Sequence, residues 1–326
     1  PSRSHLSQQR HGGTRAAKRL AQSTAPRPST HSQRDRGMLS GSGDSIREPR
    51  DGSHIMSAHT HARRTTMRDL QSRTDKGQPW AMVTAYDALT AGIFESAGVP
   101  ALLVGDSAAM VVHGHDSTIP ITVDELLPMV SAVVRGTQEA LVIADLPFGS
   151  YQEGPSQALA TATRFMKDAG AHAVKLEGGV SVLPQVEALA SAGIPVIGHL
   201  GLTPQSVNLL GGYRVQGRGE SGQLLMRDAK SLEAAGATAV VLEVVPEDLA
   251  AQVSEVLTIP TIGIGAGSGT DAQVIVWQDL LGLTPDPAPR FVRRYANLRD
   301  LMKESVGQWV EDVQDRTYPA AEHSYR

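Results

Sequence analysis

Cysteine is absent from this chain of 326 residues, and its absence excludes several kinds of site. Without cysteine there is no disulfide framework, no thiolate zinc site and no cysteine nucleophile. A bound metal would have to be held by oxygen or imidazole ligands, which favours a hard ion such as Mg²⁺.

Aromatic residues, excess charge and long apolar runs are also scarce. Aromatic residues make up only 4% of the chain, so no stacking platform for a large flat ligand stands out. The net charge of −4 offers no basic surface for nucleic acid or for an acidic membrane. No apolar run reaches the ~18 residues of a membrane span. We therefore expect a soluble protein with neither nucleic-acid nor membrane partners.

Residues 1–62 differ in composition from the rest of the chain. They are rich in Ser, Arg, Gly, Gln and His and lack apolar periodicity, so we predict a disordered extension. The Arg-rich, acid-poor beginning resembles an organellar transit peptide. The alternative is a start site placed too early, with Met38, Met56 or Met67 as the true initiator. We expect a cytoplasmic protein, with organellar targeting as the lesser alternative.

Residues 63–326 are predicted to form one catalytic domain. Apolar runs of strand length alternate with helical patterns at a spacing close to the ~30 residues of a βα unit. Runs that are apolar on both faces are typical of a parallel sheet. About eight such units predict a (β/α)8 TIM barrel, with a doubly wound open sheet as the alternative. The predicted strands are Ala81–Tyr86, Ala101–Gly105, Leu141–Leu146, Ala173–Leu176, Pro195–Leu200, Ala239–Val244, Thr261–Ile264 and a weaker one around Leu280–Leu283.

Predicted helices lie between these strands, and several of them end in Ala-Gly, a common helix stop. A further helix at the C-terminus is expected to pack outside the barrel. The clearest helical segments are Val123–Arg135, Pro155–Ala169, Ser221–Ala235, Pro246–Leu257 and the final Glu304–Gln314.

Charged and polar residues follow one predicted strand after another. A charge at the end of a buried strand is costly unless it serves a site. In a barrel these strand ends meet on one face and build a pocket. The residues are Asp106, Ser107, Asp145, Lys175, Glu177, His199 and Glu243.

Three of these residues, Asp106, Asp145 and Glu177, are carboxylates at successive strand ends. In a shared pocket they would raise one another's pKa unless a cation were present. Oxygen ligands suit Mg²⁺, so the three carboxylates are predicted to form its site. The alternative is that each one merely caps a helix or pairs with an arginine.

The remaining charged residues have distinct candidate roles. Lys175 lies two positions before Glu177, so both side chains point to one face, where the ammonium could bind a carboxylate or an enolate oxygen. An ordinary charge pair on an exposed face is the alternative. His199 is a candidate catalytic residue, although a lone histidine is often structural. Glu243 has apolar neighbours that suit a general base.

The glycine-rich loop Gly263–Gly269 lacks the spacing of the dinucleotide-binding fingerprint. Its backbone amides could hold an anion such as a carboxylate. A tight turn of the barrel explains it equally well.

Longer motifs resemble the ketopantoate hydroxymethyltransferase (3-methyl-2-oxobutanoate hydroxymethyltransferase) family. The resemblance runs from about Thr65 to Ser324 and covers the whole predicted barrel. The motifs are Gly105-Asp106-Ser107, Gly114-His115-Asp116-Ser117-Thr118, Asp145-Leu146-Pro147-Phe148, Val174-Lys175-Leu176-Glu177-Gly178-Gly179, Gly198-His199-Leu200-Gly201-Leu202-Thr203-Pro204-Gln205-Ser206, Gly211-Gly212-Tyr213, Val215-Gln216-Gly217-Arg218, Leu242-Glu243 and Ile262-Gly263-Ile264-Gly265-Ala266-Gly267.

The resemblance implies a barrel enzyme of pantothenate biosynthesis. It would transfer a hydroxymethyl group from 5,10-methylenetetrahydrofolate to 3-methyl-2-oxobutanoate through a Mg²⁺-stabilised enolate, forming 2-dehydropantoate. Family members commonly assemble as homodecamers.

The resemblance also implies residue roles. Mg²⁺ would be bound by Asp106 and Asp145, with Glu177 as a ligand or linked through water. Substrate would be bound by Asp106, Ser107, Asp145 and Lys175. Glu243 would be the base, and His199 would hydrogen-bond the substrate or product. The assigned site residues are Asp106, Ser107, Asp145, Lys175, Glu177, His199 and Glu243.

Two other functions are compatible with the same residue types. One is another metal-dependent enolate enzyme on this barrel, such as a 2-oxo acid aldolase or an isocitrate-lyase-like enzyme, which folate dependence would distinguish. The other is a non-catalytic anion-binding barrel, which metal-dependent proton exchange on the oxo acid would exclude.

Overall fold

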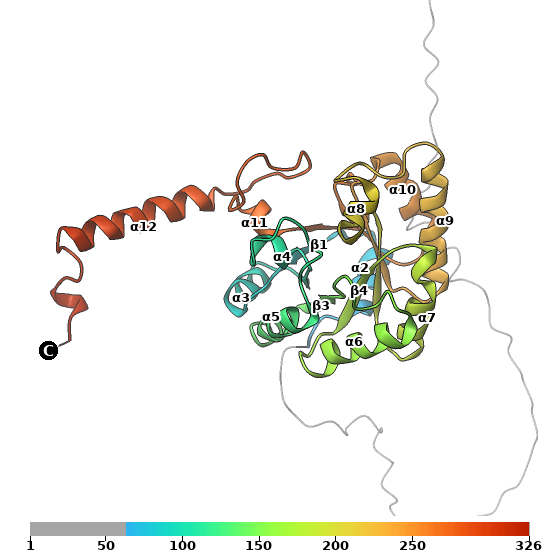
Figure 1. Cartoon of the computed structure of the whole chain (residues 1–326), viewed down its shortest axis with the longest axis horizontal. Coiled ribbons are helices and arrows are strands. Elements are labelled where there is room, and N and C mark those ends of the chain that lie inside the picture. The colour runs from blue at the N-terminus through green and yellow to red at the C-terminus, as the bar shows by residue number, and fades with distance from the viewer. Residues whose placement is uncertain (1–62, 326) are drawn as a thin grey trace, which may run out of the picture. The chain divides into compact units, whose positions relative to one another are not determined.

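The computed structural model describes residues 63–325, so the predictions for residues 1–62 lie outside it. Eight parallel strands form a closed barrel in which each strand pairs with the next and β8 pairs with β1 (Figure 1). This confirms the (β/α)8 prediction and excludes the open sheet. The strands are β1 (Trp80–Thr84), β2 (Ala101–Val104), β3 (Leu141–Asp145), β4 (Ala173–Glu177), β5 (Val196–Gly201), β6 (Ala239–Glu243), β7 (Thr261–Ile264) and β8 (Ala272–Ile275).

Helices alternate with the strands around the barrel, and their sequences carry recognisable start signals (Figure 1). Thr122 and Glu125 form a reciprocal capping box at the start of α5. Pro155 occupies the first turn of α6, where its missing N–H costs nothing. The helices are α2 (Met67–Asp75), α3 (Ala88–Ser96), α4 (Ala108–Val111), α5 (Val123–Arg135), α6 (Pro155–Lys167), α7 (Leu183–Ser191), α8 (Val207–Leu210), α9 (Glu220–Ala234), α10 (Glu247–Val256), α11 (Trp277–Leu280) and α12 (Leu298–Gln314), with 3-10 turns η1 (Val180–Val182), η2 (Pro204–Ser206) and η3 (Ala321–His323).

The last strand was predicted wrongly. It is β8, at Ala272–Ile275, and not the segment around Leu280–Leu283. Gln273 is exposed and interrupts the apolar run of this short strand, which weakens its signal. Leu280 ends α11 and packs against the outer core instead. A short apolar run alone does not separate a strand from a buried helical turn.

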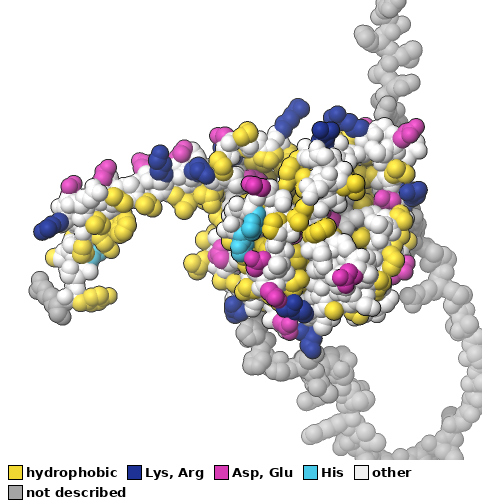
Figure 2. Space-filling view, viewed as in Figure 1, with side chains coloured by type: hydrophobic (Ala, Val, Ile, Leu, Met, Phe, Trp, Pro, Cys, Tyr) yellow, Lys and Arg dark blue, Asp and Glu magenta, His cyan; other side chains and the backbone are white. Residues whose placement is uncertain are grey.

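The C-terminal helix α12 lies outside the barrel, as predicted, but it is not packed against the barrel. It begins six residues earlier than the predicted segment, at Leu298, and none of its residues is buried. Apolar side chains line one side of α12 and charged side chains the other (Figure 2).

Alternation along the strands sorts their side chains into two apolar layers. Leu103 belongs to the cluster inside the barrel, whereas Leu102 belongs to the cluster between strands and helices. The same alternation applies to β4, where Val174 and Leu176 face the helices. Lys175 must therefore point into the barrel. In the part of the chain that the structure describes, no helix is long and apolar enough to cross a membrane.

Candidate functional site

The strand-end residues meet in one cavity of about 700 Å³ at the carboxyl ends of the strands. The barrel interior below them is filled by apolar side chains. The structure therefore brings together every residue that the sequence assigned to the site. The predicted residues that line this cavity are Asp106, Ser107, Asp145, Lys175, Glu177, His199 and Glu243.

Lys175 forms a buried ion pair at the centre of the cluster. Its Nζ lies 2.6 Å from Asp145 Oδ1 and 3.9 Å from Glu177 Oε1. Burial alone would lower the pKa of Lys175, but the charges of Asp145 and Glu177 raise it above its ordinary value. The side chain of Lys175 therefore stays protonated and positively charged. The alternative of an exposed charge pair is excluded, because Lys175 is buried.

Asp106 has no cation of its own among the described residues that would balance its charge. Burial raises its pKa well above the ordinary value, and the charges of Asp145 and Glu177 raise it further. Burial also raises the pKa of Asp145, although Lys175 opposes that shift. Lys175 lies between Asp145 and Glu177, and Asp106 is left as the carboxylate without a contacting cation in residues 63–325, which is the charge distribution that a bound cation would relieve.

The donor set fits Mg²⁺. This ion binds proteins through one or two carboxylates and completes its octahedron with water and substrate oxygens, so Asp106 and Asp145 suffice. Within residues 63–325, no group of three or more Asp, Glu, His or Cys side chains already converges as a metal cage. Glu177 is engaged elsewhere, because its Oε2 accepts a hydrogen bond from the Gln205 backbone N–H at 3.0 Å.

His199 links the carboxylate cluster to Glu243. Its Nδ1 lies 3.3 Å from Glu177 Oε1 and its Nε2 lies 3.2 Å from Glu243 Oε2. These contacts are within ion-pair distance but lack hydrogen-bond geometry. Burial and Lys175 lower the pKa of His199, but Glu177 and Glu243 together raise it to about 9. The imidazole is therefore a cation near neutral pH.

Glu243 is the most open carboxylate of the group, with 16% of its side chain exposed against 2% for Glu177. It ends β6, and its backbone carbonyl accepts a hydrogen bond from Leu202 N–H at 2.8 Å. The next residue, Val244, has φ of 49°, which is uncommon for a β-branched residue. Such strain is concentrated at functional sites. No sequence pattern predicts this backbone conformation.

Ser107 lies beside the carboxylates, as predicted. Its Oγ is 2.8 Å from the hydroxyl of Tyr86, which comes from the end of β1. Tyr86 is buried, and burial raises its pKa, so its hydroxyl stays protonated. Ser107 and Tyr86 are therefore two uncharged hydrogen-bonding groups at the edge of the charged cluster.

Two buried residues that the sequence analysis did not single out contact the cluster. Gln205 Nε2 donates to Asp106 Oδ2 at 2.9 Å, and Tyr151 Oη lies 2.8 Å from Gln205 Oε1. Gln205 belongs to one of the motifs quoted above, but nothing about an uncharged amide marked it as part of the site. Tyr151 belongs to no quoted motif.

The rim of the cavity is apolar and aromatic. Met110, Tyr213 and Phe291 line it, with Arg290 beside Phe291. Tyr213 Oη lies 3.8 Å from Met110 Sδ, so helix α4 and the loop after α8 approach each other here. Phe291 occupies the space that a side chain at Gly265 would need. This contact favours the tight-turn interpretation of the glycine-rich loop.

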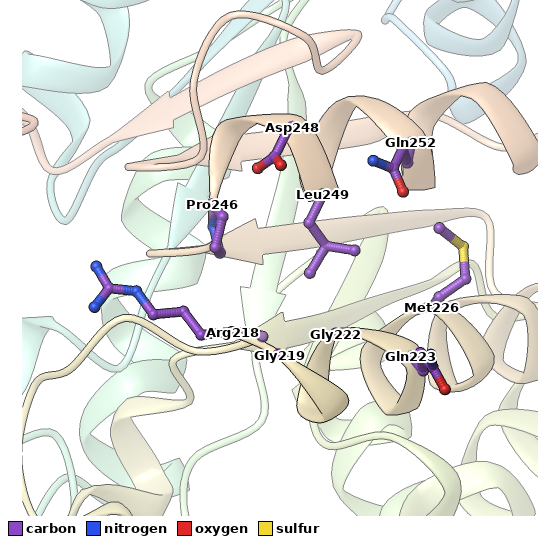
Figure 3. Close-up of a pocket in the computed structure, with 10 residues that line it drawn as sticks. Arg218, Gly219, Gly222, Gln223, Met226, Pro246, Asp248, Leu249 and Gln252 are labelled. Carbon is purple, nitrogen blue, oxygen red and sulfur yellow. The ribbon is translucent and has the colours of Figure 1, made fainter.

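A second cavity of about 600 Å³ lies outside the barrel, between α9 and α10 (Figure 3). Asp248, Leu249 and Gln252 extend from α10, and Arg218 extends from the loop before α9 (Figure 3). Its polar side chains are exposed, and none of the predicted site residues lines it. It therefore adds nothing to the strand-end site.

Comparisons with known proteins agree with the motifs. A family model described as ketopantoate hydroxymethyltransferase matches residues 64–321. A 3-methyl-2-oxobutanoate hydroxymethyltransferase of Frankia casuarinae is 63% identical over 262 residues, which cover 80% of this chain and 88% of that protein. The enzyme of the same name from Thermobifida fusca is 58% identical over 280 residues, covering 83% of this chain and all of that protein.

Solved structures share the fold at much lower sequence identity. A phosphonopyruvate hydrolase solved with oxalate and Mg²⁺ is 14% identical, with a TM-score of 0.52, and the alignment covers 79% of this chain and 93% of that chain. At this identity the likeness is evidence for the barrel alone.

Proposed function

Since the chain belongs to the ketopantoate hydroxymethyltransferase family and is an enzyme of that family, we propose that it uses 5,10-methylenetetrahydrofolate to hydroxymethylate 3-methyl-2-oxobutanoate, forming 2-dehydropantoate. The observation that carries the proposal is the cavity at the strand ends. It combines a buried group of carboxylates with an ammonium, an imidazolium and a more open carboxylate, Glu243.

The proposed metal is Mg²⁺, held by Asp106 and Asp145 with Glu177 close by. The excess of buried negative charge at this position supports the assignment. When bound, the ion would draw electron density from the ketone and carboxylate oxygens of the oxo acid and thereby make its C3–H more acidic.

The side chains around this position have the chemistry for proton removal. Glu243 is the proposed base that takes the C3 proton, and the electron pair of that bond becomes the enolate. Lys175 offers a buried positive charge for the carboxylate or enolate oxygen. The imidazolium of His199 neighbours Glu243 and would hydrogen-bond substrate or product. Water adds to the one-carbon unit, and its C–N bonds break with their electron pairs returning to the folate nitrogens, which releases tetrahydrofolate and formaldehyde. The enolate carbon then attacks the formaldehyde carbon, and the formaldehyde oxygen takes a proton to become the hydroxyl of 2-dehydropantoate.

The size and lining of the cavity support a second, larger reactant. A five-carbon oxo acid displaces roughly five water molecules, or about 150 Å³, whereas the cavity measures about 700 Å³. We propose that the folate ring binds at the rim, against Met110, Tyr213 and Phe291. Arg290 makes no ion pair with any residue of the described part of the chain, and it could pair with the anionic tail of the folate.

The proposed assembly is a homo-oligomer, with the decamer of the resemblance as its specific form. The exposed apolar side of α12 supports it, because contiguous apolar surface of this kind marks an interaction site. A second copy of the chain is the proposed partner. The named relatives come from bacteria, which supports the predicted cytoplasmic placement.

Exchange of the C3 proton of 3-methyl-2-oxobutanoate in deuterated water, followed by NMR, tests the function. We expect exchange that requires Mg²⁺, and formation of 2-dehydropantoate when methylenetetrahydrofolate is added. Glu243→Gln should slow exchange at least ~100-fold, as expected for loss of a general base, while substrate still binds. Glu247→Gln, on the exposed first turn of α10, is the matched control and should exchange at the wild-type rate.

Each other outcome has a defined meaning. Exchange without folate-dependent transfer would favour an aldolase or lyase. No exchange in the presence of metal would contradict the enzymatic role of the strand-end residues. Unchanged exchange in Glu243→Gln would remove Glu243 from the role of base.

A further inference from the structure

We infer that Gln205 and Tyr151 are positioning residues that set the affinity of the site for Mg²⁺ by holding the carboxylates of Asp106 and Glu177. The inference rests on the proposed metal site. Neither residue would touch the ion. Gln205 would act through the carboxylates of Asp106 and Glu177 that it contacts, and Tyr151 would act through the Gln205 amide and the backbone of Glu177.

Gln205 joins two of the carboxylates through separate groups. Its side-chain Nε2 donates to Asp106 Oδ2 at 2.9 Å, and its backbone N–H donates to Glu177 Oε2 at 3.0 Å. Nε2 also donates to the backbone oxygen of Leu146 at 3.0 Å, one residue after Asp145. Gln205 therefore links the ends of β2, β3 and β4 from the loop that follows β5.

The hydrogen-bond partners determine the orientation of the Gln205 amide. Two acceptors, Asp106 Oδ2 and the Leu146 carbonyl, face one end of the amide, so this end must be the NH₂ group, which has two hydrogens to donate. The amide oxygen then faces the hydroxyl of Tyr151 at 2.8 Å. The flipped amide would place three oxygen acceptors together without a hydrogen between them.

Tyr151 Oη has one hydrogen and two acceptors within reach, Gln205 Oε1 at 2.8 Å and the Glu177 carbonyl oxygen at 3.1 Å, and the shorter contact makes Gln205 the main acceptor. The tyrosine oxygen in turn accepts from the backbone of Glu177. The Glu177 N–H lies 3.2 Å from the tyrosine oxygen, in reach of its free lone pair. Tyr151 and Gln205 are both buried, and burial raises the pKa of the phenol, so the hydroxyl keeps its hydrogen. A single chain of hydrogen bonds thus runs from Glu177 through Tyr151 and Gln205 to Asp106.

This chain of bonds opposes the mutual repulsion of the carboxylates. The charges of Asp145 and Glu177 act against ionised Asp106, and an unrestrained side chain would turn away from them. The Gln205 amide fixes one oxygen of Asp106 and leaves the other available as a ligand. Such restraint lowers the ordering cost of binding, and loss of comparable outer contacts typically weakens metal affinity ~10- to 100-fold.

The test is direct Mg²⁺ binding by calorimetry without substrate, with paramagnetic Mn²⁺ binding as a second readout. We expect Gln205→Met, which keeps the length of the side chain but cannot donate, to weaken Mg²⁺ binding at least ~10-fold. Tyr151→Phe removes only the hydroxyl and should weaken binding several-fold. Because both residues act through the same amide, the double variant should bind no more weakly than about the Gln205→Met variant alone.

Gln185→Met is the matched control. Gln185 is also a buried amide next to Tyr151, since its Nε2 donates to the Tyr151 backbone oxygen at 3.2 Å, but no contact links it to a carboxylate of the site. It should lower the thermal midpoint to a similar degree and leave the Mg²⁺ affinity within about twofold of wild type. If Gln205→Met does not fold, Tyr151→Phe alone decides the test.

The outcomes separate this inference from the proposed function. Wild-type affinity in Gln205→Met or in a folded Tyr151→Phe would overturn the positioning role while the metal site stands. An equal loss of Mg²⁺ affinity in the Gln185→Met control would show that these hydrogen bonds contribute only to stability. That result would also overturn the inference. No Mg²⁺ binding by the wild-type protein would overturn both the metal site and this inference.

Discussion

At the scale of single residues, the sequence identifies those site members whose charge conflicts with their surroundings. Lys175 and Glu177 were recognisable because charges alternate there with apolar residues of a buried strand. Gln205 was not recognisable in this way, because an amide is tolerated in loops and in cores alike. The strained backbone of Val244 depends on contacts with Ile264 and Gln216, which lie far away in the sequence. Local patterns carry no information about such contacts.

The backbone next to Glu243 gives a residue-scale prediction at Gly201. A methyl group at Gly201, where φ is +94°, would lie 2.2 Å from the carbonyl oxygen of Glu243. We expect Gly201→Ala to displace the end of β6 that carries this carboxylate. C3 proton exchange should fall more than ~10-fold, and the free energy of unfolding should fall by about 2–4 kcal/mol.

Gly193→Ala is the matched control for strain alone. Gly193 has a similar φ of +79°, but no atom lies within 4 Å of the added methyl group. Gly193→Ala should lower the free energy of unfolding by about 1 kcal/mol and leave C3 proton exchange at the wild-type rate. Wild-type exchange in Gly201→Ala would show that the position of Glu243 does not depend on this close approach.

At the scale of elements, prediction succeeded where the hydrophobic pattern and the end signals agree. The helix α5 was predicted with its observed bounds, because its capping box and its Ala-Val-Val-Arg-Gly end leave little freedom. β8 was missed because it has four residues and one of them, Gln273, is exposed. Its strand character comes from pairing with β1 and β7 when the barrel closes.

The junction of β3 and β4 gives a prediction about pH. His172 Nδ1 accepts the backbone N–H of Val142 at 3.1 Å, so this nitrogen must be unprotonated in the folded state. Burial, together with the charge of Arg64, lowers the pKa of His172 to about 4. In the unfolded chain the ordinary value is about 6.5.

The sign of the effect follows from proton binding. Between pH 6.5 and pH 4 the unfolded state binds more protons at this position than the folded state, so stability falls as the pH falls through this range. Because His172 is partly exposed, we expect the free energy of unfolding to fall by about 2 kcal/mol, which is less than the full pKa shift would give. In His172→Asn the amide oxygen can accept the same N–H without titrating. Denaturation midpoints at pH 7, 6, 5 and 4 should therefore diverge, and parallel curves for the two proteins would contradict the assignment.

At the scale of the whole molecule, the buried apolar side chains of residues 63–325 belong to the barrel and its surrounding helices, whereas α12 buries none of its own residues. Met302, Val306, Trp309 and Val313 recur at helical spacing along one side of α12, and all are exposed by more than 40%. A stripe with this spacing is typical of a helix that packs against another surface. The sequence located the helix but could not show that its partner surface is missing from the barrel.

An oligomer that depends on α12 is the corresponding prediction. Val306→Asp combined with Trp309→Asp places two charges in the stripe and should convert the assembly to smaller species in light scattering or sedimentation. The barrel should stay folded, because α12 buries no residue within one chain. Gln308→Asp, on the opposite side of the same helix, is the control and should leave the assembly intact.

All seven assigned site residues come from one barrel, so C3 proton exchange should survive dissociation. A wild-type protein that is monomeric at micromolar concentration, or an unchanged assembly in the double variant, would contradict this role for α12.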